Sequence, residues 1–211
     1  MMVMLLFVLT GCSKISEIKY DGKDVVYTCT KDEIELLKSD VDVIAEANQG
    51  FLTIVNGEWN EVINNEEKHE IKYREKNSDN GNVDACYFIN YDNMNYKFGT
   101  ITPISFKDKD EGSIRFHVKG NYDYTIDNMQ LFYDNILSTE DFGDTMETVY
   151  RKINAEIVAT YILNMNSKTF AELKAETVFN AEMIERVNSI IKDAYGIKLT
   201  KVNIENVEKI S

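Results

Sequence analysis

The sequence predicts an α+β fold, in which an antiparallel-rich β part is followed by two helices and a final strand. Apolar and polar residues alternate over several segments between residues 40 and 126, and this period of two is typical of half-buried strands. After Asp127 the apolar residues recur at helical spacing, and the closing segment IKLTKVNIENVEKI again resembles a strand. Strands first and helices second favour an α+β class over repeated βαβ units.

The β part contains one long strand and one well-marked hairpin. Along the long strand, the apolar side chains that share one face are Ile114, Phe116, Val118, Tyr122, Tyr124 and Ile126. The dipeptide Asn56-Gly57 separates the apolar runs FLTIV and EWNEVI, and it favours a type I′ turn with positive φ at both residues. Further strands are expected over residues 40–47, 69–75 and 84–91.

The helical part is predicted to contain two helices. The first carries an apolar stripe and is preceded by Ser138-x-x-Asp141, which approximates a capping box. Its stripe consists of Phe142, Met146, Val149, Ile153, Ile157 and Tyr161. The second starts at the capping box Thr169-x-x-Glu172 and ends before Gly196, a suitable C′ residue. Its apolar face consists of Phe179, Met183, Val187, Ile190, Ile191 and Ala194.

Composition and charge exclude several classes of partner. Hydrophobic residues make up 44% of the chain and charged residues 28%, which indicates a globular protein rather than a disordered one. The formal net charge is −13 and no Lys/Arg cluster is present, so neither nucleic acid nor a polybasic grip on anionic lipid is expected. A charged segment over residues 12–40, with a short helix capped by Thr30 or Asp32, precedes a domain over residues 41–211.

The N-terminus MMVMLLFVLTGC has no charged side chain through Cys12. It is too short to span the roughly 30 Å hydrocarbon core of a bilayer, but its length suits the apolar region of a signal peptide. Leu9-Thr10-Gly11-Cys12 resembles the lipobox of bacterial lipoproteins. That resemblance implies a signal peptide over residues 1–11, cleavage before Cys12 and a diacylglycerol on the Cys12 sulfur.

Two further cysteines, Cys29 and Cys86, leave two alternatives open. An extracytoplasmic location would permit a disulfide between them, whereas two buried free thiols are the interpretation favoured by the strand-like setting of Cys86. Neither cysteine belongs to a C-x-x-C motif, so no zinc or redox motif is indicated.

No catalytic, cofactor or metal motif is found in the sequence. His69 and His117 have no partner at metal-ligand spacing, and we interpret both as exposed strand residues. The acidic turn Asp108, Asp110 and Glu111 offers oxygens for calcium, but it lacks the length and spacing of an EF-hand loop. We therefore expect a protein that is not an enzyme and has no cofactor.

Five segments follow one another in an order that carries a family resemblance. They are ANQGFLTIVNGEW (47–59), YFIN (87–90), KFGTITPISFKD (97–108), RFHVKGNYDYTIDN (115–128) and YGIKLTKVNIENV (195–207). In this order they resemble an SPFH/Band 7 domain, the module of stomatins, prohibitins and flotillins. The closer likeness is to a bacterial branch described as virion-core-protein-like. The likeness spans residues 40–208, and within it Gly120 is expected to allow close packing.

The resemblance implies a non-enzymatic, membrane-associated scaffold that forms homo-oligomers and organises membrane or partner proteins. With Cys12 lipidated, the domain is expected on the extracytoplasmic face; the alternative is the cytoplasmic side of the membrane. A second functional hypothesis is a monomeric extracytoplasmic lipoprotein that binds a ligand or a protein. It would need a concave aromatic pocket, for which the candidates are Tyr122, Tyr124, Tyr133 and Tyr150. We expect these tyrosines instead to pack the sheet against the helices.

Overall fold

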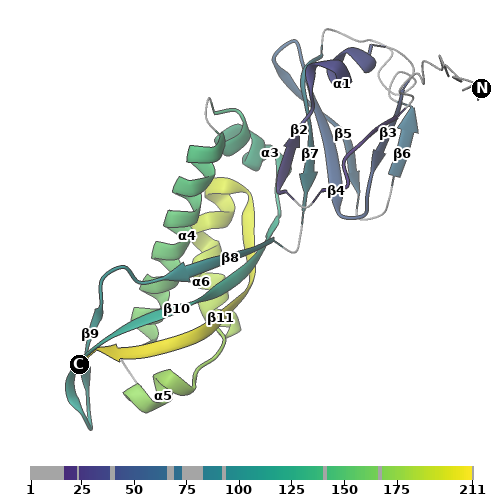
Figure 1. The fold of residues 1–211 in the computed structure, drawn as a ribbon. Helices are drawn as coiled ribbons and strands as arrows, with labels where there is room; N and C mark the ends of the chain where they lie inside the picture. Colours follow the sequence, from purple (N-terminus) through teal and green to yellow (C-terminus); the bar gives the residue numbers. More distant parts are fainter. Residues whose placement is uncertain are drawn as a thin grey trace, which may run out of the picture. The chain divides into compact units, whose positions relative to one another are not determined.

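A computed structural model describes residues 17–210, except residues 23, 39–40, 66–68, 73–82, 92–93, 140–141 and 166–167. Its strands and helices are drawn in Figure 1. The chain divides into two compact units, of which the first ends at Asn90 and the second begins at Tyr91. The sequence interpretation placed residues 41–211 in a single domain, so this boundary falls inside that range.

The first unit is built from two sheets and one short helix. The three-stranded sheet has the order β1 (Glu17–Lys19), β3 (Asp42–Ala45), β6 (His69–Lys72). The four-stranded sheet has the order β2 (Val26–Thr28), β7 (Val83–Asn90), β4 (Gln49–Val55), β5 (Glu58–Asn65). All pairings in these sheets are antiparallel except that of β1 with β3.

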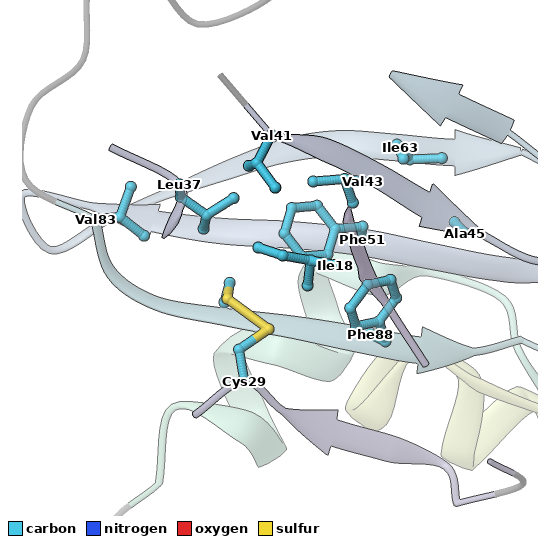
Figure 2. Packing of buried hydrophobic residues seen from close by; sticks show 11 residues of the cluster. Ile18, Cys29, Leu37, Val41, Val43, Ala45, Phe51, Ile63, Val83 and Phe88 are labelled. Carbon is cyan, nitrogen blue, oxygen red and sulfur yellow. A yellow bond between two sulfur atoms is a disulfide. The ribbon is translucent and has the colours of Figure 1, made fainter. Parts of the chain in front are cut away.

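Local sequence signals decide the turns of this unit. Asn56 and Gly57 have φ values of 53° and 77°, which confirms the predicted type I′ hairpin between β4 and β5. Helix α1 (Lys31–Leu36) begins at a capping box formed by Thr30 and Glu33, so Thr30 rather than Asp32 is the cap. The core of this unit is formed by side chains from both sheets, and Figure 2 shows Phe51 in the middle of the cluster beside Ile18 and Val43.

Cys29 and Cys86 are joined by a disulfide in this core, with their Cα atoms 5.4 Å apart. Cys86 lies on β7 and is fully buried, and Cys29 follows β2 directly. The Cys29 N–H also donates to the Cys86 carbonyl at 2.9 Å, which continues the β2–β7 pairing by one step. The bridge therefore fastens the short β2 strand and the start of α1 to a central strand of the sheet.

The second unit is a sheet of four strands with helices packed on it. Strand β10 (Gly112–Ile126) is central: β11 (Ile197–Ile210) pairs along one edge, and β8 (Met94–Gly99) and β9 (Ile104–Asp108) pair along the other. All these pairings are antiparallel, and the predicted alternation along β10 is confirmed, because the six apolar residues of its inner face are buried. This arrangement of antiparallel sheets, helices and a C-terminal strand confirms the α+β class.

The helices are α3 (Met129–Phe132), the π-helical turn η1 (Tyr133–Leu137), α4 (Phe142–Met165), α5 (Phe170–Ala175) and α6 (Ala181–Tyr195). The stripe predicted for the first long helix faces the core from Met146 to Tyr161. Ser138 ends η1 instead of starting α4, because its hydroxyl donates to the Asp134 carbonyl, and Asp141 lies outside the described residues. The sequence analysis missed α3, whose cap is Asn128.

The prediction of one helix between Thr169 and Gly196 is wrong, because this segment forms two helices, α5 and α6. Thr169 and Glu172 do form the predicted capping box, but α5 ends at Ala175. The next residues run beside β11 instead: Ile204 N–H donates to the Thr177 carbonyl at 2.7 Å, and Phe179 N–H donates to Val202 at 3.0 Å. These bonds to a sheet edge replace the helical ones. On α6, Ile190 and Ala194 are exposed rather than buried, whereas Gly196 is the predicted left-handed C-cap.

Candidate interaction surface

A groove of about 540 Å³ lies in the second unit between helix α4 and the segment 99–105, which leads from β8 into β9. This segment, GTITPIS, is part of one of the most specific pieces of the family resemblance. From α4 the groove is lined by Asn154, Ala155, Val158, Ala159 and Ile162. The opposite wall is the 99–105 segment itself, whose Ile101 side chain is 94% exposed.

The 99–105 segment is fixed at its start by side chains of α4 and β10. The Gly99 N–H donates to Asn154 Oδ1 at 2.9 Å, and the Thr100 N–H donates to the Val118 carbonyl at 3.0 Å. His117 Nδ1 lies 3.1 Å from the Thr100 carbonyl oxygen and 3.0 Å from the Thr100 hydroxyl oxygen, so this ring nitrogen contacts the segment in either tautomer. The His117 side chain is partly buried and contacts the 99–105 segment, so its interpretation as an exposed strand residue is corrected.

Asp108 fixes the other end of the same sequence piece. Its side chain is buried, and one carboxylate oxygen accepts from the N–H groups of Asp110 and Glu111, each at 2.7 Å. The other oxygen accepts from the Phe170 N–H at 2.6 Å. Phe170 is the first residue of α5, and its N–H has no hydrogen-bond partner within the helix. Asp108 thus joins the β9–β10 turn to α5, and both of its carboxylate oxygens accept hydrogen bonds from backbone N–H groups.

Acidification should remove a stabilising contribution from Asp108. Backbone N–H donors, first that of Phe170, lower the pKa of this carboxyl from its ordinary 3.8. A lowered folded-state pKa means that the contribution is present above about pH 4 and is lost as the pH falls through the folded value. Between about pH 5 and pH 2, thermal scans should show a steeper loss of Tm for the wild type than for Asp108→Asn, whose amide cannot titrate.

The matched control for this prediction is Asp110→Asn, which changes an exposed carboxylate of the same turn. It should keep the wild-type dependence of Tm on pH. Equal slopes for the wild type and Asp108→Asn would show that the Asp108 contacts do not carry the acid sensitivity.

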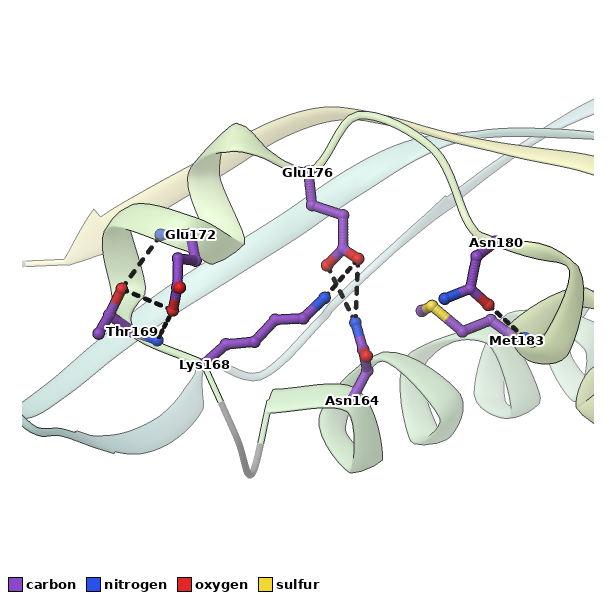
Figure 3. Close-up of polar contacts among 7 residues, drawn as sticks. All are labelled: Asn164, Lys168, Thr169, Glu172, Glu176, Asn180 and Met183. Atoms are coloured by element: carbon purple, nitrogen blue, oxygen red, sulfur yellow. Dashed lines mark hydrogen bonds and ion pairs between the residues drawn. The ribbon is translucent and has the colours of Figure 1, made fainter.

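The end of α4 is held by a partly buried polar cluster, which Figure 3 shows around Glu176. Asn164 Nδ2 donates to both carboxylate oxygens at 3.1 and 3.0 Å, and Lys168 Nζ forms an ion pair with one of them at 2.6 Å. Because Glu176 begins the segment that runs beside β11, this cluster fixes the last turns of α4 relative to the sheet. The α4 wall of the groove is therefore anchored at both ends, by Asn154 and by Asn164.

The tyrosines considered as ligand-pocket candidates pack mainly inside the unit. Tyr122 and Tyr124 are almost fully buried, and burial raises the pKa of both phenols. Tyr124 and Tyr150 share a hydrogen bond of 2.8 Å between their hydroxyls, and the Tyr150 ring stacks on Tyr96 with centroids 3.8 Å apart. This is the packing of sheet against helix that the sequence analysis favoured, and none of these tyrosines lines the groove.

The other sequence candidates are placed as follows. Cys12 and the lipobox lie outside the described residues, as does the side chain of His69. In the described part of the chain, no group of three or more His, Cys, Asp or Glu side chains is arranged to hold a metal ion. Of the helices that the structure describes, none combines the length and the apolar character that crossing a bilayer requires.

Comparison with known families assigns the second unit to one of them. The model of the SPFH domain-Band 7 family matches residues 81–210, which is more than half of the chain. The chain belongs to this family. The match covers β7 and nearly all of the second unit, including both walls of the groove. A search of curated proteins finds no match. Proteins with an SPFH domain are generally membrane-associated, non-enzymatic scaffolds.

Residues 41–80, which the sequence analysis also assigned to the SPFH-like domain, lie outside the family match. Their assignment stays a prediction, as does the virion-core-protein-like branch. The groove was missed by the sequence analysis, although a signal for it exists: the last nine residues of α4, IVATYILNM (157–165), contain no charged residue on any side of the helix.

Proposed function

We propose that this protein is a membrane-anchored SPFH scaffold that self-assembles and organises membrane or partner proteins. The observation that carries the proposal is the family match over residues 81–210. The virion-core-protein-like branch is part of the same proposal.

We propose that the anchor is a lipid on Cys12, added after removal of residues 1–11, and that the domain lies on the extracytoplasmic face. The apolar run ending in Leu9-Thr10-Gly11-Cys12 supports the anchor. The disulfide between Cys29 and Cys86 supports the location, because such bonds persist in oxidising compartments. The cytoplasmic side of the membrane is the alternative, and it would leave both cysteines reduced.

Lipidation would also promote assembly. A single acyl chain binds membranes only marginally, whereas the two or three chains of a lipoprotein hold it firmly. Anchored copies are confined to two dimensions, which raises their effective concentration toward one another. A lateral contact that is weak in solution can then suffice for assembly, and this matters for a chain with a net charge of −13, whose copies repel each other.

Replacing Cys12 by serine should move the protein from the membrane fraction to the soluble fraction of its host. The Cys12 thiol is the site of lipid attachment that the lipobox predicts, so the serine variant should also fail to incorporate a labelled fatty acid. Ser13→Ala, a change at the neighbouring residue, is the control and should stay membrane-bound and labelled. A Cys12→Ser variant that remains in the membrane fraction would show that the anchor lies elsewhere.

A second candidate function is a monomeric lipoprotein that binds an apolar ligand, and the groove is the observation that favours it. Its volume of about 540 Å³ lies within the range of roughly 300–1,000 Å³ typical of ligand sites. Mass photometry of protein extracted gently from membranes separates the two functions. A discrete assembly of many copies supports the scaffold. A monomer whose Tm rises on addition of an apolar ligand supports the second candidate.

A further inference from the structure

The exposed face of α4 is unusual for a surface helix. A helix that covers a sheet normally carries an apolar stripe toward the core and charged residues toward solvent. Between residues 157 and 165, however, α4 has no charged residue on any side. Ile157 and Tyr161 face the core, while Ile162 and Leu163 are 40% and 47% exposed. Exposed isoleucine and leucine side chains on a stretch of helix without charge favour a partner that covers them.

The groove extends this uncharged face onto the 99–105 segment. None of the described residues that line the groove is charged, although 28% of the chain is. At its rim, Ile101 stands almost free of its own unit, and Pro103 restricts the backbone two residues further on. The segment is also tied at Gly99 and Thr100, so Ile101 is presented on a fixed support rather than on a free loop.

We propose that this face is the contact between two copies of the chain, with Ile101 of each copy inserted into the groove of the other. The inference rests on the self-assembly in the proposed function and adds one surface that contributes to it by pairing two copies. Ile101 and the groove are a protrusion and a hollow on the same face, which is the arrangement that a two-fold contact requires. The contact buries Ile101 against Val158 and Ile162 of the second copy.

The absence of charge from the groove lining favours contact between two acidic copies at this face. With a net charge of −13, two copies repel each other wherever acidic surfaces meet. The groove contributes no carboxylate to such a contact, so two copies can approach there without bringing acidic groove residues together. Burial of the apolar side chains of Ile101, Val158 and Ile162 then supplies the attraction.

Ile101→Glu tests the contact on the full-length protein in detergent. A carboxylate at this position would be buried without a partner in the contact, so self-association should weaken by ~100-fold or more in mass photometry and sedimentation. Its Tm should equal that of the wild type, because the side chain touches little of its own unit. Ile190→Glu changes an exposed isoleucine of α6 outside the groove and should leave association unchanged.

Cross-linking tests the geometry directly. One pool of protein carries Ile101→Cys and a second, differently tagged pool carries Ala159→Cys, an exposed position of the α4 wall. After mixing and mild oxidation, the proposal expects a disulfide between the two tags. Ile190→Cys in place of Ile101→Cys should give none. Of the chain's own three cysteines, Cys29 and Cys86 are buried and joined to each other, and Cys12 carries the lipid in the proposed function, so the introduced thiols are the ones available for the cross-link.

The outcomes separate this inference from the proposed function. If the wild type assembles and Ile101→Glu assembles equally well without cross-links, the scaffold stands and this contact is wrong. If the wild type is monomeric in detergent, and cross-linking in membranes also yields no species larger than a monomer, the scaffold and the contact are both wrong. If native mass spectrometry instead shows a wild-type monomer with a bound lipid, and the Ile162→Glu variant has lost that lipid, the groove binds an apolar ligand rather than a second copy.

Discussion

Replacing Gly120 by valine is expected to lower the free energy of unfolding by about 3 kcal/mol or more and the Tm by about 10 °C. Gly120 is buried in β10, where a Cβ atom would lie 1.9 Å from the Asn203 carbonyl oxygen and 2.7 Å from the Phe98 ring. The carbonyl belongs to the backbone of the neighbouring β11, so the side chain cannot be accommodated by a change of rotamer. The two strands would have to separate.

Alanine at position 120 should already cause most of this loss, because the clash arises at the Cβ atom. Valine ordinarily favours strands over glycine, so a simple propensity argument predicts the opposite sign. Gly99→Ala on β8 is the matched control: its nearest neighbour is Lys119 Cβ at 3.4 Å, an ordinary contact. Thermal unfolding followed by circular dichroism measures all three variants. An unchanged Tm for Gly120→Ala would contradict the close approach of β10 and β11.

The sequence singled out Gly120 but could not supply the reason. The pairing of β10 with β11 shifts its register between Lys119 and Gly120, and the close approach of the two backbones occurs at this bulge. A bulge adds a residue to one strand only, so it depends on both strands at once. Alternation along β10 alone predicts which side chains are buried, but it does not show where the partner strand comes closest.

Local signals account for much of the fold. The Asn56-Gly57 turn, the capping box at Thr169 and the C-cap at Gly196 lie where the sequence placed them, because each depends on three or four neighbouring residues. The cap of α1 is Thr30, one of the two residues that the sequence offered. The break after Ala175 could not be read in the same way. Its cause is the edge of β11, which lies some 25 residues further along the chain and offers hydrogen bonds to Thr177 and Phe179.

The candidate surface was less accessible to sequence reasoning than the fold. Ligand and catalytic motifs consist of chemically distinctive residues, whereas the groove is lined by isoleucine, alanine, valine and threonine, which also make cores. Helical spacing assigned Ile157 and Tyr161 correctly to the buried face. It could not show that Ile162 and Leu163 are left uncovered. The support of the 99–105 segment by Asn154 and His117 joins residues that are 55 and 17 positions apart.

Removing the disulfide should destabilise the first unit by about 4 kcal/mol. Cys29 and Cys86 are 57 residues apart, and in the chain-entropy model a cross-link over such a loop restricts the unfolded chain by this amount. The double variant Cys29→Ala/Cys86→Ala should therefore melt well below the wild type. Hydrogen–deuterium exchange should locate the loss in β2 and β7, the strands that the bridge joins, while β10 and β11 of the second unit keep their protection.

Reduction of the wild type provides the matched control, because it opens the bridge without changing the sequence. A phosphine reductant should lower the Tm of the wild type toward that of the double variant and leave the double variant unchanged. If the reductant shifts neither protein, the two cysteines are free thiols in the folded protein, as the strand-like setting of Cys86 first suggested. The disulfide would then no longer support an extracytoplasmic location, and the lipobox at Cys12 would be the remaining argument for it.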